Sequence, residues 1–146
     1  MSRHLLRFRI AGVPLALCAS DAASVHEDVQ VIPLPGASAG FCGVATLCGQ
    51  VMAVLDPAAL LSPPAPPDAG RGIVLLLLAG EGEGVALRVP EGMSLSRGGA
   101  EAPVPERCLA LCAQGDRDGD GEVWGVLSAR LLVAALAAAA PAGAAD

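Results

Sequence analysis

The chain has 146 residues, a hydrophobic fraction of 53%, and a formal net charge of −6, with arginine as its only Lys/Arg-type cation. A chain of this length suits one domain with a substantial core. Its negative charge disfavours phosphate backbones and anionic lipid surfaces as partners. Two phenylalanines and one tryptophan are also too few aromatic rings to stack single-stranded bases. We therefore expect no nucleic-acid partner.

The N-terminal forty residues predict a hairpin followed by an extended crossing. Apolar residues alternate over residues 6–10 and again over 13–17, on either side of Ala11-Gly12, which is typical of a half-buried hairpin. Residues 21–27 are expected to form an irregular or briefly helical crossing. Pro33 and Pro35 then indicate an extended approach that is not a central strand.

The segment Gly43–Asp56 is the most organised part of the sequence. Two apolar runs meet at Gly49, which predicts a second hairpin, and Asp56 followed by Pro57 is typical of a capped helical start. The segment contains no nucleophile, base or ligand cluster. This combination favours a surface for another protein over an active site.

The second half of the sequence predicts a further set of short strands. Five of the nine positions in residues 62–70 are Pro or Gly, so we expect a stiff connector between two halves of the molecule. Residues 94–107 are rich in Gly, Pro and Glu and are expected to form a loop. The remaining expectations are strands at 72–79 and 85–89, strands at 108–113 and 122–127, a helix at 128–139 capped by Ser128, and a disordered tail at 137–146.

The acidic segment Asp116–Gly121 matches the first half of a calcium-binding EF-hand loop. Position twelve of that loop would be Leu127, which cannot supply the bidentate carboxylate. We therefore interpret the segment as a polar hairpin turn, and expect no metal site and no cofactor.

Five cysteines are present, including the pairs Cys42/Cys48 and Cys108/Cys112. If each pair lies along a strand, its members are roughly 20 Å and 13 Å apart, at about 3.3 Å per residue. A disulfide needs Cα atoms within about 7 Å. We therefore expect the cysteines to be free thiols that pack as small buried hydrophobic residues, as in a protein of a reducing compartment. His4 and His26, the only histidines, are expected to be structural or surface residues, so no catalytic residue is predicted.

The Gly43–Asp56 segment resembles the motif of the CheW-like family, the adaptors that couple chemoreceptors to a histidine kinase in bacterial chemotaxis. The shared positions are Gly43, Leu47, Gly49 and Asp56, together with apolar residues between them. The first hairpin and residues 84–89 resemble further parts of the family pattern. The resemblance extends from about Leu6 to about Leu132.

The resemblance implies an all-β fold of two small five-stranded SH3-like β-barrels packed on each other, with short helical segments and a C-terminal helix. Residues 1–136 would form one such domain. Its implied function is that of a non-enzymatic adaptor that binds a kinase regulatory domain and a chemoreceptor cytoplasmic tip. The apolar runs are shorter than the roughly 20 residues that a membrane span needs. Charges also interrupt the N-terminal apolar runs, so we expect a cytoplasmic protein without direct membrane insertion.

The family places its contact residues around the hairpin turn, so the resemblance implies Thr46, Cys48 and Gln50 as protein-binding residues. The chain departs from the family at several polar or shape-defining positions. Cys48 replaces an Arg, Thr46 an Asn, Ala53 a Pro, and Arg88 an Asp.

These departures leave two alternatives open. The chain could be a divergent scaffold for another two-component or motility system. The other alternative is a small thiol enzyme or metal-binding protein that uses Cys48, Cys108 or Cys112.

Overall fold

The structure is a computed structural model that describes residues 3–35, 40–65, 73–80, 83–90 and 92–139. Its strands are short and follow one another closely along the chain. They are β1 His4–Ile10, β2 Val13–Cys18, β3 Ala22–His26, β4 Phe41–Leu47, β5 Gln50–Leu55, β6 Ile73–Leu78, β7 Val85–Pro90, β8 Ser94–Arg97, β9 Ala100–Ala102, β10 Cys112–Arg117 and β11 Val123–Leu127. Short 3-10 turns occupy Ala19–Asp21, Pro57–Leu60 and Glu106–Cys108, and the helix α1 spans Ala129–Ala139. None of the described helices is long and apolar enough to cross a membrane.

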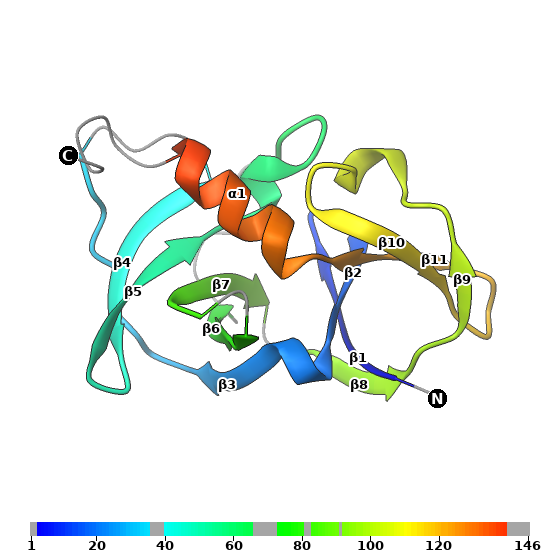
Figure 1. Cartoon of the computed structure of the whole chain (residues 1–146), viewed down its shortest axis with the longest axis horizontal. Helices are drawn as coiled ribbons and strands as arrows, with labels where there is room; N and C mark the ends of the chain where they lie inside the picture. Colours follow the sequence, from blue (N-terminus) through cyan, green and yellow to red (C-terminus); the bar gives the residue numbers. More distant parts are fainter. Residues whose placement is uncertain (1–2, 36–39, 66–72, 81–82, 91, 140–146) are drawn as a thin grey trace.

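The strands form two sheets that lie side by side in Figure 1. The six-stranded sheet has the order β8-β1-β2-β11-β10-β9, and the five-stranded sheet has the order β3-β6-β7-β5-β4. Each sheet contains one parallel pair, β11 with β2 and β5 with β7. The six-stranded sheet therefore joins the first hairpin of the chain to its last strands, while the five-stranded sheet uses the middle of the chain.

Strand β6 is apolar throughout, and its described side chains are buried on both faces of the sheet. Val74, Leu76 and Leu78 belong to the core that also contains Leu15 and Leu127 of the six-stranded sheet. The alternate residues Leu75 and Leu77 belong to a second, smaller core. That alternation follows from the two-residue period of a strand.

Helix α1 packs on the main core through Leu132, which is fully buried. The hydroxyl of Ser128 accepts a hydrogen bond from the backbone N–H of Leu131 at 3.3 Å, as expected for an N-cap. Figure 1 shows the helix lying across the region where the two sheets meet. The predicted helix and its cap are thus confirmed. Residues 137–139, which were expected to begin a disordered tail, belong to this helix, and residues 140–146 lie outside the described residues.

The predicted β-rich class is confirmed, with two curled sheets and a C-terminal helix. The hairpins β1-β2 and β4-β5 and the antiparallel pair β6-β7 also occur as predicted. The first sheet has six strands where five were predicted. Closure of each sheet into an SH3-like barrel stays a prediction.

Residues 62–70 do not separate two halves of the molecule, because β5 before them and β6 after them belong to the same sheet. Residues 66–70 of this segment lie outside the described residues. The prediction was wrong because proline content indicates a connector but not which elements it connects.

Three other local predictions were wrong. Part of 21–27, expected to be irregular or helical, is the edge strand β3, paired with β6. Residues 94–107, expected to be a loop, contain β8 and β9, which pair with β1 and β10. Residues 108–111 were expected to begin a strand, but Cys108 ends a 3-10 turn, residues 109–111 form a turn, and β10 starts at Cys112. In the first two cases pairing with a distant strand outweighs weak local preference.

Candidate functional site

The β4-β5 hairpin turns at Cys48 and Gly49, which have φ angles of 52° and 77°. Two consecutive positive φ angles are those of a type I′ turn, whose twist matches the flanking strands. Gly49 adopts this conformation without strain, whereas Cys48 bears the steric cost of a left-handed non-glycine residue. The turn holds the hairpin tip away from the core.

The three residues implied as protein-binding lie together at this tip. Thr46 faces Val51 across the hairpin, and Leu47 faces Gln50. Thr46, Cys48 and Gln50 are all exposed, and Val51 between them is 70% exposed. The structure therefore brings the predicted residues onto one accessible turn, while their role as contacts stays a prediction.

Gly43 holds a neighbouring segment against β4. The backbone groups of Ile32 and Val44 exchange hydrogen bonds of 2.8 and 2.9 Å. A Cβ atom at position 43 would lie 2.1 Å from the carbonyl oxygen of Ile32, and the φ of Gly43 is 139°. Only glycine permits this close approach. The motif glycine thus allows the backbone at Ile32 to lie directly against β4.

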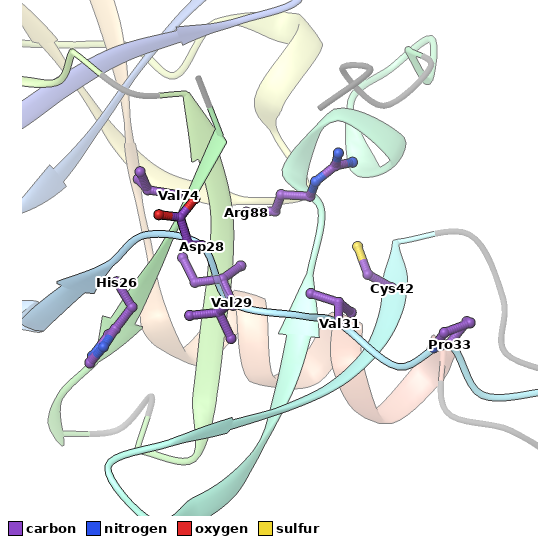
Figure 2. A pocket seen from close by; sticks show the side chains of 9 residues that line it. His26, Asp28, Val29, Val31, Pro33, Cys42, Val74 and Arg88 are labelled. Carbon is purple, nitrogen blue, oxygen red and sulfur yellow. The ribbon is translucent and has the colours of Figure 1, made fainter. Parts of the chain in front are cut away.

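A groove of about 460 Å³ opens where this segment crosses the five-stranded sheet. Figure 2 shows the segment passing in front of the sheet, with Val29 and Val31 along it. Most of the lining is apolar, and a few titratable groups lie among it. The lining residues are His26, Asp28, Val29, Val31, Pro33, Cys42, Val74, Leu75 and Arg88.

Arg88 of the groove lies beside Asp56, the residue that follows β5. One Asp56 oxygen, Oδ1, accepts a hydrogen bond from the N–H of Ala58 at 2.9 Å, which confirms the predicted cap. The other, Oδ2, lies 3.5 Å from Nη1 of Arg88. Sequence reasoning noted Arg88 only as a departure from the family pattern. Asp56 is shared with the family pattern, and its ion pair with Arg88 gives Arg88 a structural role.

Cys42 and His26 are two of the titratable groups that line the groove. Burial, with a smaller contribution from the charge of Asp56, raises the pKa of Cys42 to about 11, so this thiol is protonated at neutral pH. The Nε2 atom of His26 shares a hydrogen bond of 2.7 Å with the hydroxyl of Ser24. This arrangement suits non-covalent binding of an apolar surface with a few polar contacts.

Several exposed apolar side chains belong to the five-stranded sheet or to the segment that crosses it. Among the described residues, six large apolar side chains are exposed, and four of them belong to the five-stranded sheet or to the segment that crosses it. We call these four the exposed apolar set: Val25 (49%), Ile32 (57%), Leu34 (36%) and Val51 (70%). Solvent exposure of such residues favours protein contacts.

The acidic segment Asp116–Gly121 is only partly the turn that was predicted. Asp118 accepts hydrogen bonds from the N–H groups of Asp120 and Glu122, both at 2.9 Å, as in a polar turn. Asp116, in contrast, is fully buried in β10 and lies 2.8 Å from Nη2 of Arg7. The prediction was wrong for Asp116 because its partner is 109 residues away in sequence. No group of three metal-ligating side chains occurs among the described residues.

Cys108 and Cys112 do not lie along one strand, so the predicted separation was wrong. Cys108 ends a 3-10 turn and Cys112 begins β10. A Cβ atom placed on Gly125 would lie 2.5 Å from the sulfur of Cys108 and 2.9 Å from that of Cys112. Both sulfurs therefore face the same point of β11. Both cysteines are buried, as predicted, whereas Cys48 is exposed.

Comparison with known proteins identifies the fold and the family. A family model described as CheW-like domain matches residues 4–97, which is more than half of the chain. The crystal structure of the scaffolding protein TtCheW from Thermoanaerobacter tengcongensis matches with a TM-score of 0.73 and 16% sequence identity. The match covers 88% of this chain and 90% of that one. No curated protein sequence matches the chain.

Proposed function

Because the chain belongs to the CheW-like family, we propose that it is a non-enzymatic adaptor that couples a chemoreceptor to a histidine kinase. In this proposal residues 1–136 act as one cytoplasmic domain, with each sheet closed into a small barrel. The partners are a kinase regulatory domain and a chemoreceptor cytoplasmic tip. The domain brings them together by binding, without chemistry of its own.

The observation that carries the proposal is the exposed apolar set on the five-stranded sheet. Val51 and Ile32 are 70% and 57% exposed, and they are two of the six large apolar side chains that are exposed among the described residues. The core of a protein–protein interface is enriched in apolar side chains, with polar groups at the rim. The groove beside these residues has that composition, since valines and a proline line it together with His26 and Arg88.

Within this surface we assign the hairpin tip to partner recognition. Thr46 and Gln50 present polar groups beside Val51, and Cys48 occupies the position of the family arginine. A cysteine cannot form the charge-assisted hydrogen bonds of an arginine. Contacts at this position therefore depend on shape and on the neighbouring polar groups.

The proposal is tested by titrating the full chain with a purified kinase regulatory domain and, separately, with a receptor tip from the same cell. We expect saturable binding to each, and binding of both in one ternary complex. A variant with Val51→Asp places a charge in the exposed apolar set and should weaken at least one of these complexes. Absence of binding to both partners would contradict the adaptor role while leaving the family assignment intact.

A second candidate function is that of a scaffold for another two-component or motility system. It is favoured by Arg88, which stands where the family has an aspartate. Arg88 forms an ion pair with Asp56. Capture from the native cell separates the two candidates. Recovery of chemotaxis receptors and kinase supports the first, and recovery of other signalling proteins alone supports the second.

A further inference from the structure

The two buried thiols of Cys108 and Cys112 have no part in the proposed adaptor function, yet the fold brings their sulfurs to one place. A turn closed by a hydrogen bond of 3.0 Å from the N–H of Leu111 to the carbonyl of Cys108 folds the chain back between them. Both sulfurs lie within 2.9 Å of the position that a Cβ atom on Gly125 would take. Gly125 thus leaves room for two adjacent thiols, and a larger residue there would displace them.

The two thiols also interact electrostatically. Their mutual hydrogen bond lowers the pKa of Cys108, while the same hydrogen bond and burial raise the pKa of Cys112. The thiolate is the reactive form of cysteine. Cys108 is therefore the first of the pair to react, and Cys112 remains a neutral thiol beside it.

The pair is buried, but it lies next to a turn at the surface of the protein. Leu109, between the two cysteines, is 58% exposed, so the turn that carries Cys108 lies at the surface. The thiol of Cys108 also donates a long hydrogen bond of 3.5 Å to the carbonyl of Pro105. Because Cys108 and Cys112 are 0% and 4% exposed, an oxidant would reach the sulfurs through a local opening of this turn.

We propose that Cys108 and Cys112 form a peroxide-oxidisable dithiol that closes into an intrachain disulfide and reopens with a thiol reductant. The Cys108 thiolate attacks one oxygen of hydrogen peroxide, the O–O bond breaks, and a sulfenic acid and one water molecule form. The Cys112 thiol then attacks the sulfenic sulfur, loses its proton, and displaces a second water molecule. Two thiols and one peroxide thus give one disulfide and two waters.

The bond would form in a segment that contacts several parts of the molecule. The carbonyl of Leu111 accepts a hydrogen bond of 2.9 Å from the N–H of Ser128, the cap of α1. The carbonyl of Arg107 accepts one of 2.9 Å from the N–H of Ser62, which follows the 3-10 turn after β5. Oxidation would therefore act where the six-stranded sheet, the helix and the end of β5 meet.

The test uses the full-length chain with Cys18→Ser, Cys42→Ser and Cys48→Ser, which leaves only the pair. Its fold is checked against the unsubstituted protein by circular dichroism and by the fluorescence of the single tryptophan, Trp124. After treatment with hydrogen peroxide, the protein is unfolded, labelled with a maleimide and weighed. We expect a mass lower by two hydrogen atoms, no label, and two labels after reduction with dithiothreitol.

The matched control adds Cys112→Ala to the same variant. Without a resolving thiol, Cys108 should gain oxygen atoms instead of losing hydrogen. The proposal is overturned if the pair remains fully labelled after peroxide, or if Cys108 gains oxygen while Cys112 is still labelled. Because the first variant keeps both cysteines, the test remains decisive even if the control does not fold.

Discussion

The two sheets differ in what their polar side chains contact. On the six-stranded sheet, the buried Asp116 is paired with Arg7, and its other oxygen accepts a hydrogen bond of 2.8 Å from the N–H of Gly99. The indole of Trp124 lies beneath the guanidinium groups of Arg7 and Arg9, 5.3 and 4.8 Å from its centroid. These polar side chains contact one another and stabilise the fold.

On the five-stranded sheet, some polar side chains line a groove and some apolar side chains, such as Val51, are exposed. Thr46 and Gln50 are exposed beside Val51, and Arg88 lines the groove with Val29 and Val31. The comparison separates polar groups that stabilise the molecule from exposed groups that we propose to contact a partner. Changes to the paired polar groups of the first sheet should thus cost stability, and changes to the exposed residues of the second should cost binding.

The largest expected effect is that of Asp116→Asn. It leaves the guanidinium of Arg7 buried without its counter-charge, so the free energy of unfolding should fall by about 3–5 kcal/mol. Urea denaturation measures this. The control Asp120→Asn changes an exposed carboxylate in the adjacent turn and should alter stability by about 0.5 kcal/mol or less. Equal unfolding midpoints for the two variants would contradict a structural role for the buried pair.

A smaller loss is expected for Gly43→Ala on the other sheet. Its Cβ would meet the carbonyl oxygen of Ile32 at 2.1 Å, and that backbone atom cannot rotate away. Strain and displacement together should cost about 2–3 kcal/mol. Gly49→Ala is the matched control, because its φ is 77° with nothing within 4 Å of the new Cβ, so that only about 1 kcal/mol is expected. Similar losses in chemical denaturation would show that the contact with Ile32 is unimportant.

Cys48→Gly should slightly stabilise the protein while changing the tip that we assign to recognition. Glycine relieves the left-handed strain at φ 52°, and its greater freedom in the unfolded chain offsets part of the gain, leaving about 0.5 kcal/mol. Cys48→Ser keeps the strain and serves as the control. Thermal unfolding measures stability, and titration with each partner measures affinity. A destabilised Cys48→Gly protein would contradict the strain argument.

The smallest effect concerns pH. The hydrogen bond from the indole N–H of Trp124, at 2.9 Å, holds the pKa of Asp118 below its ordinary value of 3.8. A carboxyl with a lowered folded-state pKa stabilises the protein above its ordinary pKa, and this contribution disappears as pH falls through the folded-state value. The stability difference between the unsubstituted protein and Asp118→Asn should therefore shrink in acid. Unfolding followed by Trp124 fluorescence at several pH values measures it, and a difference independent of pH would refute the assignment.

Local patterns in the sequence predicted the parts of the fold that depend on neighbouring residues. The β4-β5 hairpin follows from apolar runs around Gly49, and the cap at Asp56 follows from the adjacent Pro57. The predicted contact residues Thr46, Cys48 and Gln50 lie together for the same reason, since they flank one turn.

The parts that were missed depend on distant residues. The pairing of β2 with β11 brings together opposite ends of the chain, and only the resulting sheet buries Asp116 against Arg7. The meeting of Cys108 and Cys112 required a turn where a strand was expected. The ion pair between Asp56 and Arg88 follows from the parallel pairing of β5 and β7, which local sequence does not encode.

The central claim is that partners bind on the five-stranded sheet, and one paired titration tests it most directly. Val51→Asp and Leu95→Asp each place a charge at an exposed apolar position, 70% exposed on β5 and 62% exposed on β8. Binding of the kinase regulatory domain and the receptor tip is measured for both variants. We predict that Val51→Asp weakens at least one complex about tenfold or more, equivalent to about 1.4 kcal/mol, while Leu95→Asp leaves both unchanged. Equal losses, or a loss for Leu95→Asp alone, would contradict the account.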